Sequence, residues 1–490
     1  MGILTHRPER GTVKSSLPPL PFSRYHCLAF QPELLTESRC SPARVVAVER
    51  WNASALFLAG AVLTAASLSC SGQSRPKTGI MPVAQPERPS VNCSTGRYQP
   101  LRATLQNGFK VFLYENHTSP VVAFQAWIGV GSTDEEPGEE GIAHVLEHML
   151  FKGTERRQVG QIAQEIENAG GDINAWTSYD QTVYHLVLAS RFFDTGLDIL
   201  SDAVQNPSLD AGELERELRV VSEEIKQGED IPSRVLTQGL FTTAYATHPY
   251  RRPVIGYQRT VEKMTRQKLL AFHRLWYVPG NTTLVVVGDF DSKAALEKIE
   301  RAWASKGRAG SLRRRPRSEE PQRRMKVTVF SRKVHETQIA LAFHVPGVRH
   351  VDTAAIDAAA VILGQGESSR LNLLVKREKE LATEVYAYSY TPNDSGLLVI
   401  GASLPAGDPE STLRAVLRQV FRLTQEEVSP EELAKAQVII ESDAVYQKET
   451  VQGMARKLGF FETVAGGIEY EEEYNRLVKD LSPKTIKDTL

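Results

Sequence analysis

The chain has 490 residues, of which 41% are hydrophobic and 24% are charged, and its formal net charge is −1. This length and composition are typical of a globular protein with two or more domains. A nucleic-acid-binding protein would need a basic excess or stripe, which the sequence lacks. All four cysteines precede residue 100 (Cys27, Cys40, Cys70 and Cys93), so the folded body has neither a disulfide framework nor a thiolate metal site.

The N-terminal region carries the features of an export signal. Residues 1–50 are rich in proline, serine and arginine, so we interpret them as disordered or as an over-extended start. The apolar run 53–66 is short for a membrane span and suits the core of a signal peptide. Small residues before Cys70 resemble a bacterial lipoprotein cleavage site, although Ser67 stands where leucine is usual.

We therefore predict a signal peptide or lipoprotein-like segment over 51–70, followed by a polar, proline-containing linker over 71–96. The predicted location is the bacterial cell envelope or periplasm, with Cys70 as the candidate lipid anchor. A buried helix over the same apolar run is the alternative.

The first folded elements are strands. An Asn107–Gly108 turn between apolar residues predicts a hairpin over 104–114, and 121–130 predicts a further strand. The acidic loop 134–140 then suits the N-terminus of the helix that follows it.

That helix, predicted within 141–154, carries a chemical motif. His144, Glu147 and His148 share one face, and apolar residues on both sides predict burial. Two imidazoles at i and i+4 can hold one zinc ion, and the carboxylate can take a proton from water activated by the metal. The order His-x-x-Glu-His is the inverzincin signature. The alternative is a solvated polar face, and a metal site needs a third ligand.

A second helix, from about Asn206 to Gly228, supplies candidates for that ligand. Glu217 and Glu224 are seven residues apart, which is two turns, so they share a face. One of them can bind metal while the other orients a ligand. Helix propensity and solvation would explain these glutamates equally well without the upstream motif.

Between the two helices, the sequence predicts a helix over 159–169 and a strand over 182–188. Tyr184 is expected in the core, and His185 on the opposite face has no predicted role. Asn174 has two interpretations, as a turn residue or as a substrate-binding residue.

With these motifs in view, residues 97–490 resemble the inverzincin metallopeptidases of the pitrilysin and mitochondrial-processing-peptidase type. The pattern Gly-Gly…Asn-Ala-x-Thr…Asp-x-Thr-x-Tyr over 170–184 adds to the resemblance. The resemblance implies an α+β fold with two homologous domains, each a mostly antiparallel sheet with helices packed on it.

The resemblance also implies roles for single residues. One zinc ion per chain would be held by His144, His148 and Glu224. Glu147 would act as the general base, and Glu217 would orient a ligand without binding the metal itself. These assignments make the first domain, 97–304, the catalytic one.

Two further assignments come from the same resemblance. The Val-Val-x-Glu-Glu-Ile pattern favours Glu224 over its neighbour Glu223 as the third ligand. Asn174 and Ala175 would bind substrate, because the family's strand at this place pairs with extended peptide backbone. Such strand addition reads backbone more than side chains.

The second half repeats the first without the motif. Residues 305–325 are interpreted as a basic, solvated linker. Strands at 327–330 and 338–343 and a helix at 353–363 follow. When Gly364 is aligned with Gly153, the motif positions become alanines (Ala355, Ala358 and Ala359), which predicts a non-catalytic homologous domain over 326–490.

The second domain also departs from the family. There, an arginine and a tyrosine seven residues later commonly hold the substrate carbonyl, and the aligned positions here are Lys376 and Thr383. Lysine lacks the planar fork of arginine, and threonine lacks a phenol. A shifted register uses Arg377 but places Glu384 at the tyrosine position, and Tyr386 is two residues off. We keep Lys376 as a candidate substrate contact.

The second half also stops at Leu490, before the counterpart of the strand at 284–287. Either the chain is truncated or the sheet is completed in another way.

The resulting hypothesis is a zinc-dependent endopeptidase for extended peptides or unfolded proteins. A homologous partner subunit or a second copy would supply the arginine and tyrosine. No nucleic-acid partner is expected, and membrane contact only through the N-terminal lipid anchor. The alternatives are a non-catalytic core or assembly subunit of the same fold and a zinc enzyme with a non-peptide substrate.

Overall fold

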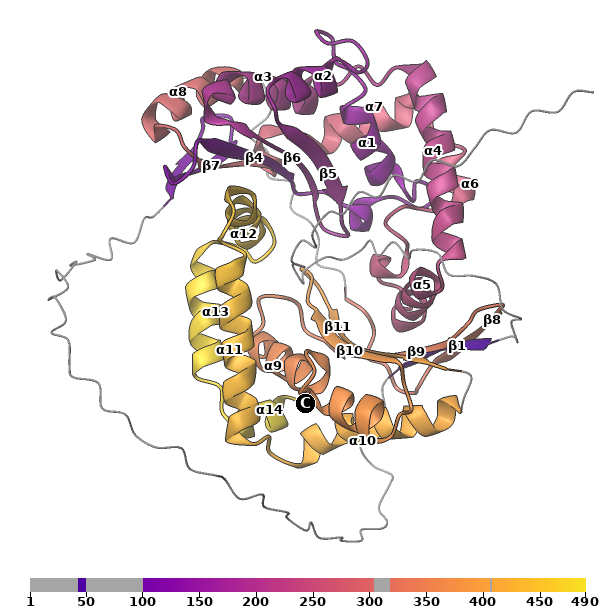
Figure 1. Cartoon of the computed structure of the whole chain (residues 1–490). Helices are drawn as coiled ribbons and strands as arrows, with labels where there is room; N and C mark the ends of the chain where they lie inside the picture. The colour runs from indigo at the N-terminus through magenta and orange to yellow at the C-terminus, as the bar shows by residue number, and fades with distance from the viewer. Residues whose placement is uncertain (1–42, 50–99, 304–317, 406–407) are drawn as a thin grey trace, which may run out of the picture. The chain divides into compact units, whose positions relative to one another are not determined.

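The computed structural model describes residues 43–49, 100–303, 318–405 and 408–490. They form two mixed sheets with helices packed on them, which confirms the α+β prediction (Figure 1). The predicted signal segment 51–70 and linker 71–96 lie outside the described residues, as does most of the basic linker. Among the described residues, no helix is long and apolar enough to cross a membrane.

The first sheet has six strands in the order β2-β3-β7-β4-β6-β5. Their bounds are Leu101–Thr104 (β2), Lys110–Glu115 (β3), Val121–Ile128 (β4), Asp172–Thr177 (β5), Thr182–Ala189 (β6) and Thr282–Gly288 (β7). The predicted hairpin joins β2 and β3, and Gly108 takes the positive φ of 87° that its turn requires. β5 lies at one edge of this sheet.

Helices cover one face of the first sheet. They are Ile142–Leu150 (α1), Gln161–Asn168 (α2), Phe193–Gln205 (α3), Ala211–Asp230 (α4), Gln258–Val261 (α6), Arg266–Trp276 (α7) and Ser292–Ala302 (α8). Short 3₁₀ turns occupy Ser132–Asp134, Ser190–Phe192, Pro249–Arg251 and Pro279–Asn281. The α1 side chains Val145, Leu146 and Met149 are fully buried, as the apolar pattern predicted.

The second sheet has the order β10-β11-β9-β1-β8. Its strands are Ala43–Glu49 (β1), Val327–Arg332 (β8), Thr337–Val345 (β9), Glu384–Tyr390 (β10) and Gly396–Leu404 (β11). The elements with it are Thr353–Gly364 (α9), the π-helical Asn372–Glu378 (η5), Pro409–Gln425 (α10), Pro430–Tyr446 (α11), Glu469–Lys479 (α13) and Pro483–Thr489 (α14). The three alanines at the motif positions are buried in α9.

β1 corrects the interpretation of residues 1–50 as disordered only at 43–49, the part of that range that the structure describes. It pairs antiparallel with β8 and parallel with β9, so it lies between these two strands. In the first sheet, β7 lies between β3 and β4 in the same way. Its direction is reversed, since β7 is parallel to β3 and antiparallel to β4. The run Ala-Arg-Val-Val-Ala-Val-Glu is rich in strand-favouring valine, a local preference that the composition of 1–50 as a whole concealed.

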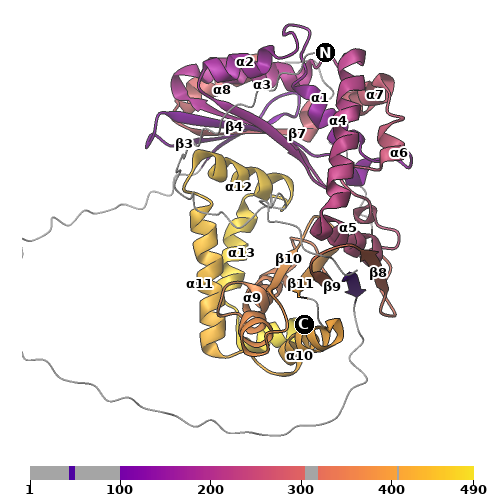
Figure 2. The same cartoon turned by 45° about the vertical axis from the view of Figure 1, so that its right-hand side comes forward.

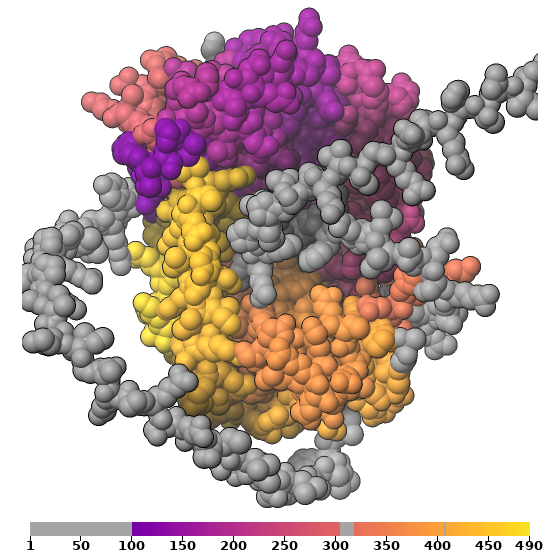
Figure 3. Space-filling model, in the orientation of Figure 1, coloured from indigo at the N-terminus to yellow at the C-terminus, as the bar shows by residue number. Residues whose placement is uncertain are grey.

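The two halves exchange a helix. Helix α5 (Pro232–Ala244) follows α4 but packs on β9 and β1 of the second sheet. Helix α12 (Val451–Thr463) follows α11 but packs on β4 and β7 of the first sheet (Figure 2). In Figure 3 the yellow surface near the C-terminus adjoins the indigo surface of the first described strands. Between β3 and α12, Lys110 Nζ lies 2.8 Å from Glu462 Oε1.

A glycine admits an aromatic ring under each exchanged helix. A Cβ on Gly239 of α5 would lie 2.4 Å from the ring of Phe330, and one on Gly459 of α12 would lie 2.1 Å from the indole of Trp127. Trp127 is 1% exposed and packs with Ala455 and Leu458 of α12. The close approach of each helix to its sheet therefore depends on the absence of a side chain at Gly239 and Gly459.

We expect Gly459→Ala to destabilise the protein by about 1–3 kcal/mol, because the added methyl group overpacks the Trp127 site. The measurement is the thermal midpoint. Gly228→Ala is the matched control, since its Cβ would be no closer than 3.7 Å to the nearest atom, and helix propensity predicts an unchanged or slightly higher midpoint. Equal midpoints for Gly459→Ala and wild type would contradict this packing.

Candidate active site

Three predicted residues converge on one point. Ligand atoms of His144, His148 and Glu224 all lie within 4.8 Å of one another. Glu224 Oε2 is 3.9 Å from His144 Nε2 and 3.8 Å from His148 Nε2. Two atoms bound to the same tetrahedral zinc ion lie about 3.3 Å apart, given bonds of about 2.0–2.1 Å. The three groups are therefore within a small rotamer adjustment of a metal site.

The loop before α1 fixes the position of the two histidines. Glu135 accepts hydrogen bonds from the backbone N–H groups of Gly141 (3.0 Å) and Ala143 (3.1 Å), which confirms the predicted role of the acidic loop at this N-terminus. Gly141 has a φ of 99°, which suits a residue without a Cβ. Burial raises the pKa of Glu135 to about 8, although both N–H donors lower it.

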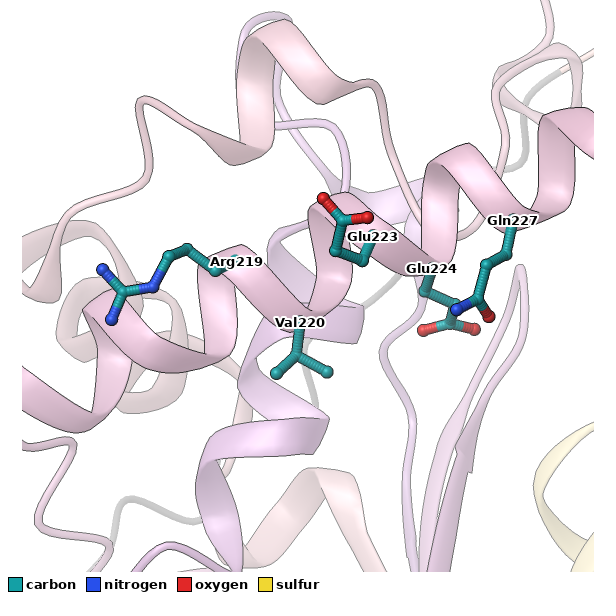
Figure 4. Close-up of a pocket in the computed structure, with 5 residues that line it drawn as sticks. All are labelled: Arg219, Val220, Glu223, Glu224 and Gln227. Carbon is teal, nitrogen blue, oxygen red and sulfur yellow. The ribbon is translucent and has the colours of Figure 1, made fainter. Parts of the chain in front are cut away.

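Helix α4 brings Glu224 over α1. It begins later than predicted, since Asp210 rather than the 206–208 segment caps it, by accepting from the N–H groups of Gly212 and Glu213. A hollow of about 430 Å³ along α4 is lined by Arg219, Val220, Glu223, Glu224 and Gln227 (Figure 4).

The close-up separates the two neighbouring glutamates of α4. The carboxylates of Glu223 and Glu224 leave the helix on opposite sides (Figure 4). Glu223 Oε1 accepts from Lys226 Nζ at 2.6 Å on the exposed surface, whereas Glu224 faces both histidines. The geometry therefore favours Glu224 as the third ligand.

Glu217 supports His148 from behind. Its Oε2 lies 3.2 Å from His148 Nδ1, and its Oε1 accepts from Lys152 Nζ at 2.7 Å. A hydrogen bond from Nδ1–H leaves the lone pair of Nε2 free for a metal. Burial and the nearby His148 lower the pKa of His144 to about 3, so this imidazole is neutral at physiological pH. Two imidazoles and one carboxylate are a donor set that suits zinc.

Glu147 lies beside these ligands and contacts β5. The hydroxyl of Thr177 donates to Glu147 Oε2. Burial raises the pKa of the Glu147 carboxyl, and the Thr177 hydrogen bonds oppose that shift. The nearby Tyr184 is fully buried, as predicted, and its hydroxyl lies 2.7 Å from that of Tyr277.

The predicted substrate residues are divided between the two halves. Asn174 and Ala175 lie within β5 rather than in a turn, and Asn174 is exposed. Lys376 lies in η5 of the second half, and the described residues give it no hydrogen bond or ion pair with the three candidate ligands. The Thr383 hydroxyl contacts Glu336 and Ser403 of its own half.

Sequence analysis gave no role to Thr177 or Lys152. Thr177 belongs to the Asn-Ala-x-Thr pattern, but only the fold shows that its hydroxyl meets Glu147 across 30 residues of chain. Lys152 follows His148 by four residues, a spacing that places two residues on one face of a helix. This spacing could have indicated that Lys152 lies near His148.

Comparison with known proteins agrees with this geometry. Residues 110–258 match the family described as Insulinase (Peptidase family M16), and residues 263–439 match the Peptidase M16 inactive domain. An uncharacterized zinc protease of Rickettsia bellii is 30% identical over 391 residues, which are 79% of this chain and 92% of that protein. The chain belongs to peptidase family M16. The predicted resemblance and the assignment as a zinc protease are thereby confirmed.

Further similar proteins extend the match. The zinc protease PqqE of Helicobacter pylori is 30% identical over 385 residues, covering 77% of this chain and 86% of that protein. A solved protease structure from Helicobacter pylori superposes with a TM-score of 0.73 at 26% identity, over 80% of this chain and 95% of that one. The first half of the periplasmic protease PqqL from Escherichia coli shares the fold at 23% identity, with a TM-score of 0.65 over 80% of this chain and 88% of that one.

The contact between Thr177 and Glu147 predicts an effect on turnover. Thr177→Val removes a hydrogen bond to a carboxylate, which is worth about 1.5–3 kcal/mol, so we expect kcat to fall about 10- to 100-fold with little change in KM. Thr177→Ser keeps the hydroxyl and is expected to restore most of kcat. Equal losses in both variants, or none in Thr177→Val, would contradict a positioning role.

Proposed function

We propose that this M16 protein is a zinc-dependent endopeptidase that hydrolyses peptide bonds in extended peptides or unfolded proteins. The observation that carries the proposal is the convergence of His144, His148 and Glu224 within 4.8 Å, with Glu147 beside them. One zinc ion per chain would occupy this point. An acid–base group next to a metal site is the arrangement that metal-assisted hydrolysis requires.

Each residue has a part in the proposed mechanism. When bound, zinc polarises the substrate carbonyl and lowers the pKa of water. Glu147 takes a proton from the water as the water oxygen attacks the carbonyl carbon. It then delivers that proton to the amide nitrogen as the C–N bond breaks. Thr177 holds the carboxylate in place, and Glu217 holds the His148 ring.

The outer edge of β5, which pairs with no other strand in the described part of the chain and is called the free edge below, is the proposed substrate platform. β5 is the last strand of the first sheet, and its Thr177 contacts the general base. An unpaired strand edge offers N–H and C=O groups to an extended chain, so Asn174 and Ala175 would border the bound backbone. Most of the backbone of a folded protein is already hydrogen-bonded internally, so extended or unfolded chains suit this edge better.

A partner chain is proposed to complete the site. Thr383 is engaged in its own half, and Lys376 has no planar fork, so neither matches the arginine and tyrosine of the family. We infer that a homologous subunit or a second copy supplies a donor to the substrate carbonyl. Lys376 is the candidate contact if no partner is needed, because it stands at the position aligned with the family's arginine.

The remaining sequence predictions are part of this proposal. We propose two homologous domains, 97–304 and 326–490, joined by the linker 305–325. Export to the cell envelope, with Cys70 as a lipid anchor, is supported by the apolar run 53–66.

Glu147→Gln is expected to lower peptide hydrolysis by about 10²- to 10⁴-fold, because it removes the general base. Zinc content should stay near one per chain, since the three ligands are intact. The measurement combines metal analysis with cleavage of a quenched unfolded peptide. Glu223→Gln, on the exposed side of α4, is the matched control and should retain activity. A wild-type protein without zinc or hydrolysis would favour the non-catalytic assembly subunit.

The partner hypothesis predicts a gain of activity on mixing. The chain alone should bind zinc but cleave slowly, and addition of a homologue that carries the arginine and tyrosine should raise kcat/KM. The readout is cleavage against partner concentration, with a partner variant that lacks the tyrosine as control. Full activity that is independent of protein concentration and unaffected by the homologue would contradict it.

A further inference from the structure

We infer that Arg456 and Trp176 form a carboxylate-binding subsite at the free edge of β5, on the sheet face opposite to Glu147. The inference rests on the proposed function, since the ligand is a carboxylate of a peptide paired with β5. It would give the enzyme a preference for acidic substrates that the zinc motif does not supply.

Helix α12 is anchored so that Arg456 reaches the edge of the sheet. Its Gln452 carbonyl accepts from the Gln125 side chain of β4 at 3.0 Å, and its Gln452 side chain lies 3.1 Å from His185 Nδ1 of β6. Arg456 lies one turn further along α12, and the next strand after β6 is β5. These contacts hold α12 so that Arg456 lies over Trp176 of β5.

Arg456 lies over the ring of Trp176 and has no hydrogen-bond acceptor within the described part of the chain. Its guanidinium carbon lies 4.3 Å from the centroid of the Trp176 ring. Among the described residues, no carboxylate or carbonyl accepts a hydrogen bond from Arg456, although a guanidinium carries five donors. Burial lowers the pKa of this side chain without any opposing acidic neighbour. The indole supports one face of the group and leaves its donors available.

The surrounding charges leave room for an anion. Asp172 on β5 is exposed and forms no ion pair with Arg456 in the described structure. Burial, and then the nearby Arg456, lower the pKa of His185 to about 4, so this ring is neutral at physiological pH. Among the described residues, Arg456 is the cation recorded over a β5 side chain.

Strand pleating links this subsite to the proposed cleavage site. Trp176 packs in the cluster shared with α12, whereas the adjacent Thr177 meets Glu147 on the other face. An added strand alternates its side chains in the same way. Every second substrate side chain would therefore face Arg456, while its neighbours face the zinc ligands.

The guanidinium plane selects the ligand class. A carboxylate can accept two parallel N–H bonds from arginine, and stacking on an indole fixes the plane for that contact. The carboxylate could belong to a glutamate or aspartate side chain or to the C-terminus of a peptide. Both sources present the same group to Arg456.

The test measures peptide binding by fluorescence anisotropy to the zinc-loaded, full-length Glu147→Gln protein, which is expected to keep its zinc and to cleave too slowly to change the peptide during the measurement. One peptide series is C-terminally amidated and carries a single glutamate or glutamine at successive positions. A second series has only glutamine and ends in a free or an amidated carboxyl group. Arg456→Gln, Arg456→Lys and the exposed control Arg418→Gln are made in the same background.

We expect the carboxylate to tighten binding about 10- to 100-fold at one position, the range for a hydrogen-bonded charged group. Arg456→Gln should abolish that gain, Arg456→Lys should retain part of it, and Arg418→Gln should leave it unchanged. The thermal midpoint of each variant identifies any loss of folding, in which case Arg456→Lys decides. A gain in the second series alone would assign the site to the peptide C-terminus.

Two results would overturn the inference alone: neutral peptides that bind with no carboxylate preference, or a preference that survives in Arg456→Gln. Failure of the proposed function has a different signature. In that case no peptide of either series binds, and the wild-type protein cleaves none of them.

Discussion

The burial of α1 between the first sheet and α4 is the constraint on which the site depends. Its apolar side chains are fully enclosed, so the helix can neither rotate nor slide without opening the core. His144, Glu147 and His148 therefore emerge along one fixed line. The groups that meet them, Glu224 from α4 and Thr177 from β5, belong to elements that pack directly on α1.

Glu135 and Glu217, two acidic residues around α1, are each paired with a hydrogen-bond donor. Glu135 accepts hydrogen bonds from the N-terminal N–H groups of α1, and Glu217 contacts Nδ1 of His148 while Glu224 lies near its Nε2. Both acids are buried, where hydrogen bonds are strong and an unpaired group would be costly. The site is thus assembled from paired acids and the neutral imidazole of His144 rather than from a concentration of one charge.

Local patterns in the sequence predicted much of this arrangement. The i, i+4 spacing of the histidines, the face shared by Glu217 and Glu224, and the Asn107–Gly108 hairpin all depend on short-range geometry. The Thr177 contact and the stacking of Arg456 on Trp176 could not be predicted, because they join residues 30 and 280 positions apart. The packing of α5 and α12 on the sheet of the other half could not be predicted either, since an apolar helix face does not reveal which sheet it will cover.

The direct succession of α4 and α5 has a mechanical meaning. Only Ile231 separates the helix that carries Glu224 from the helix that packs on the second sheet. Pro232 opens α5 and restricts the backbone at this junction, so little slack remains between them. The helix that carries Glu224 is therefore held from both ends of this junction, by its own packing on α1 and by the packing of α5 on β9 and β1.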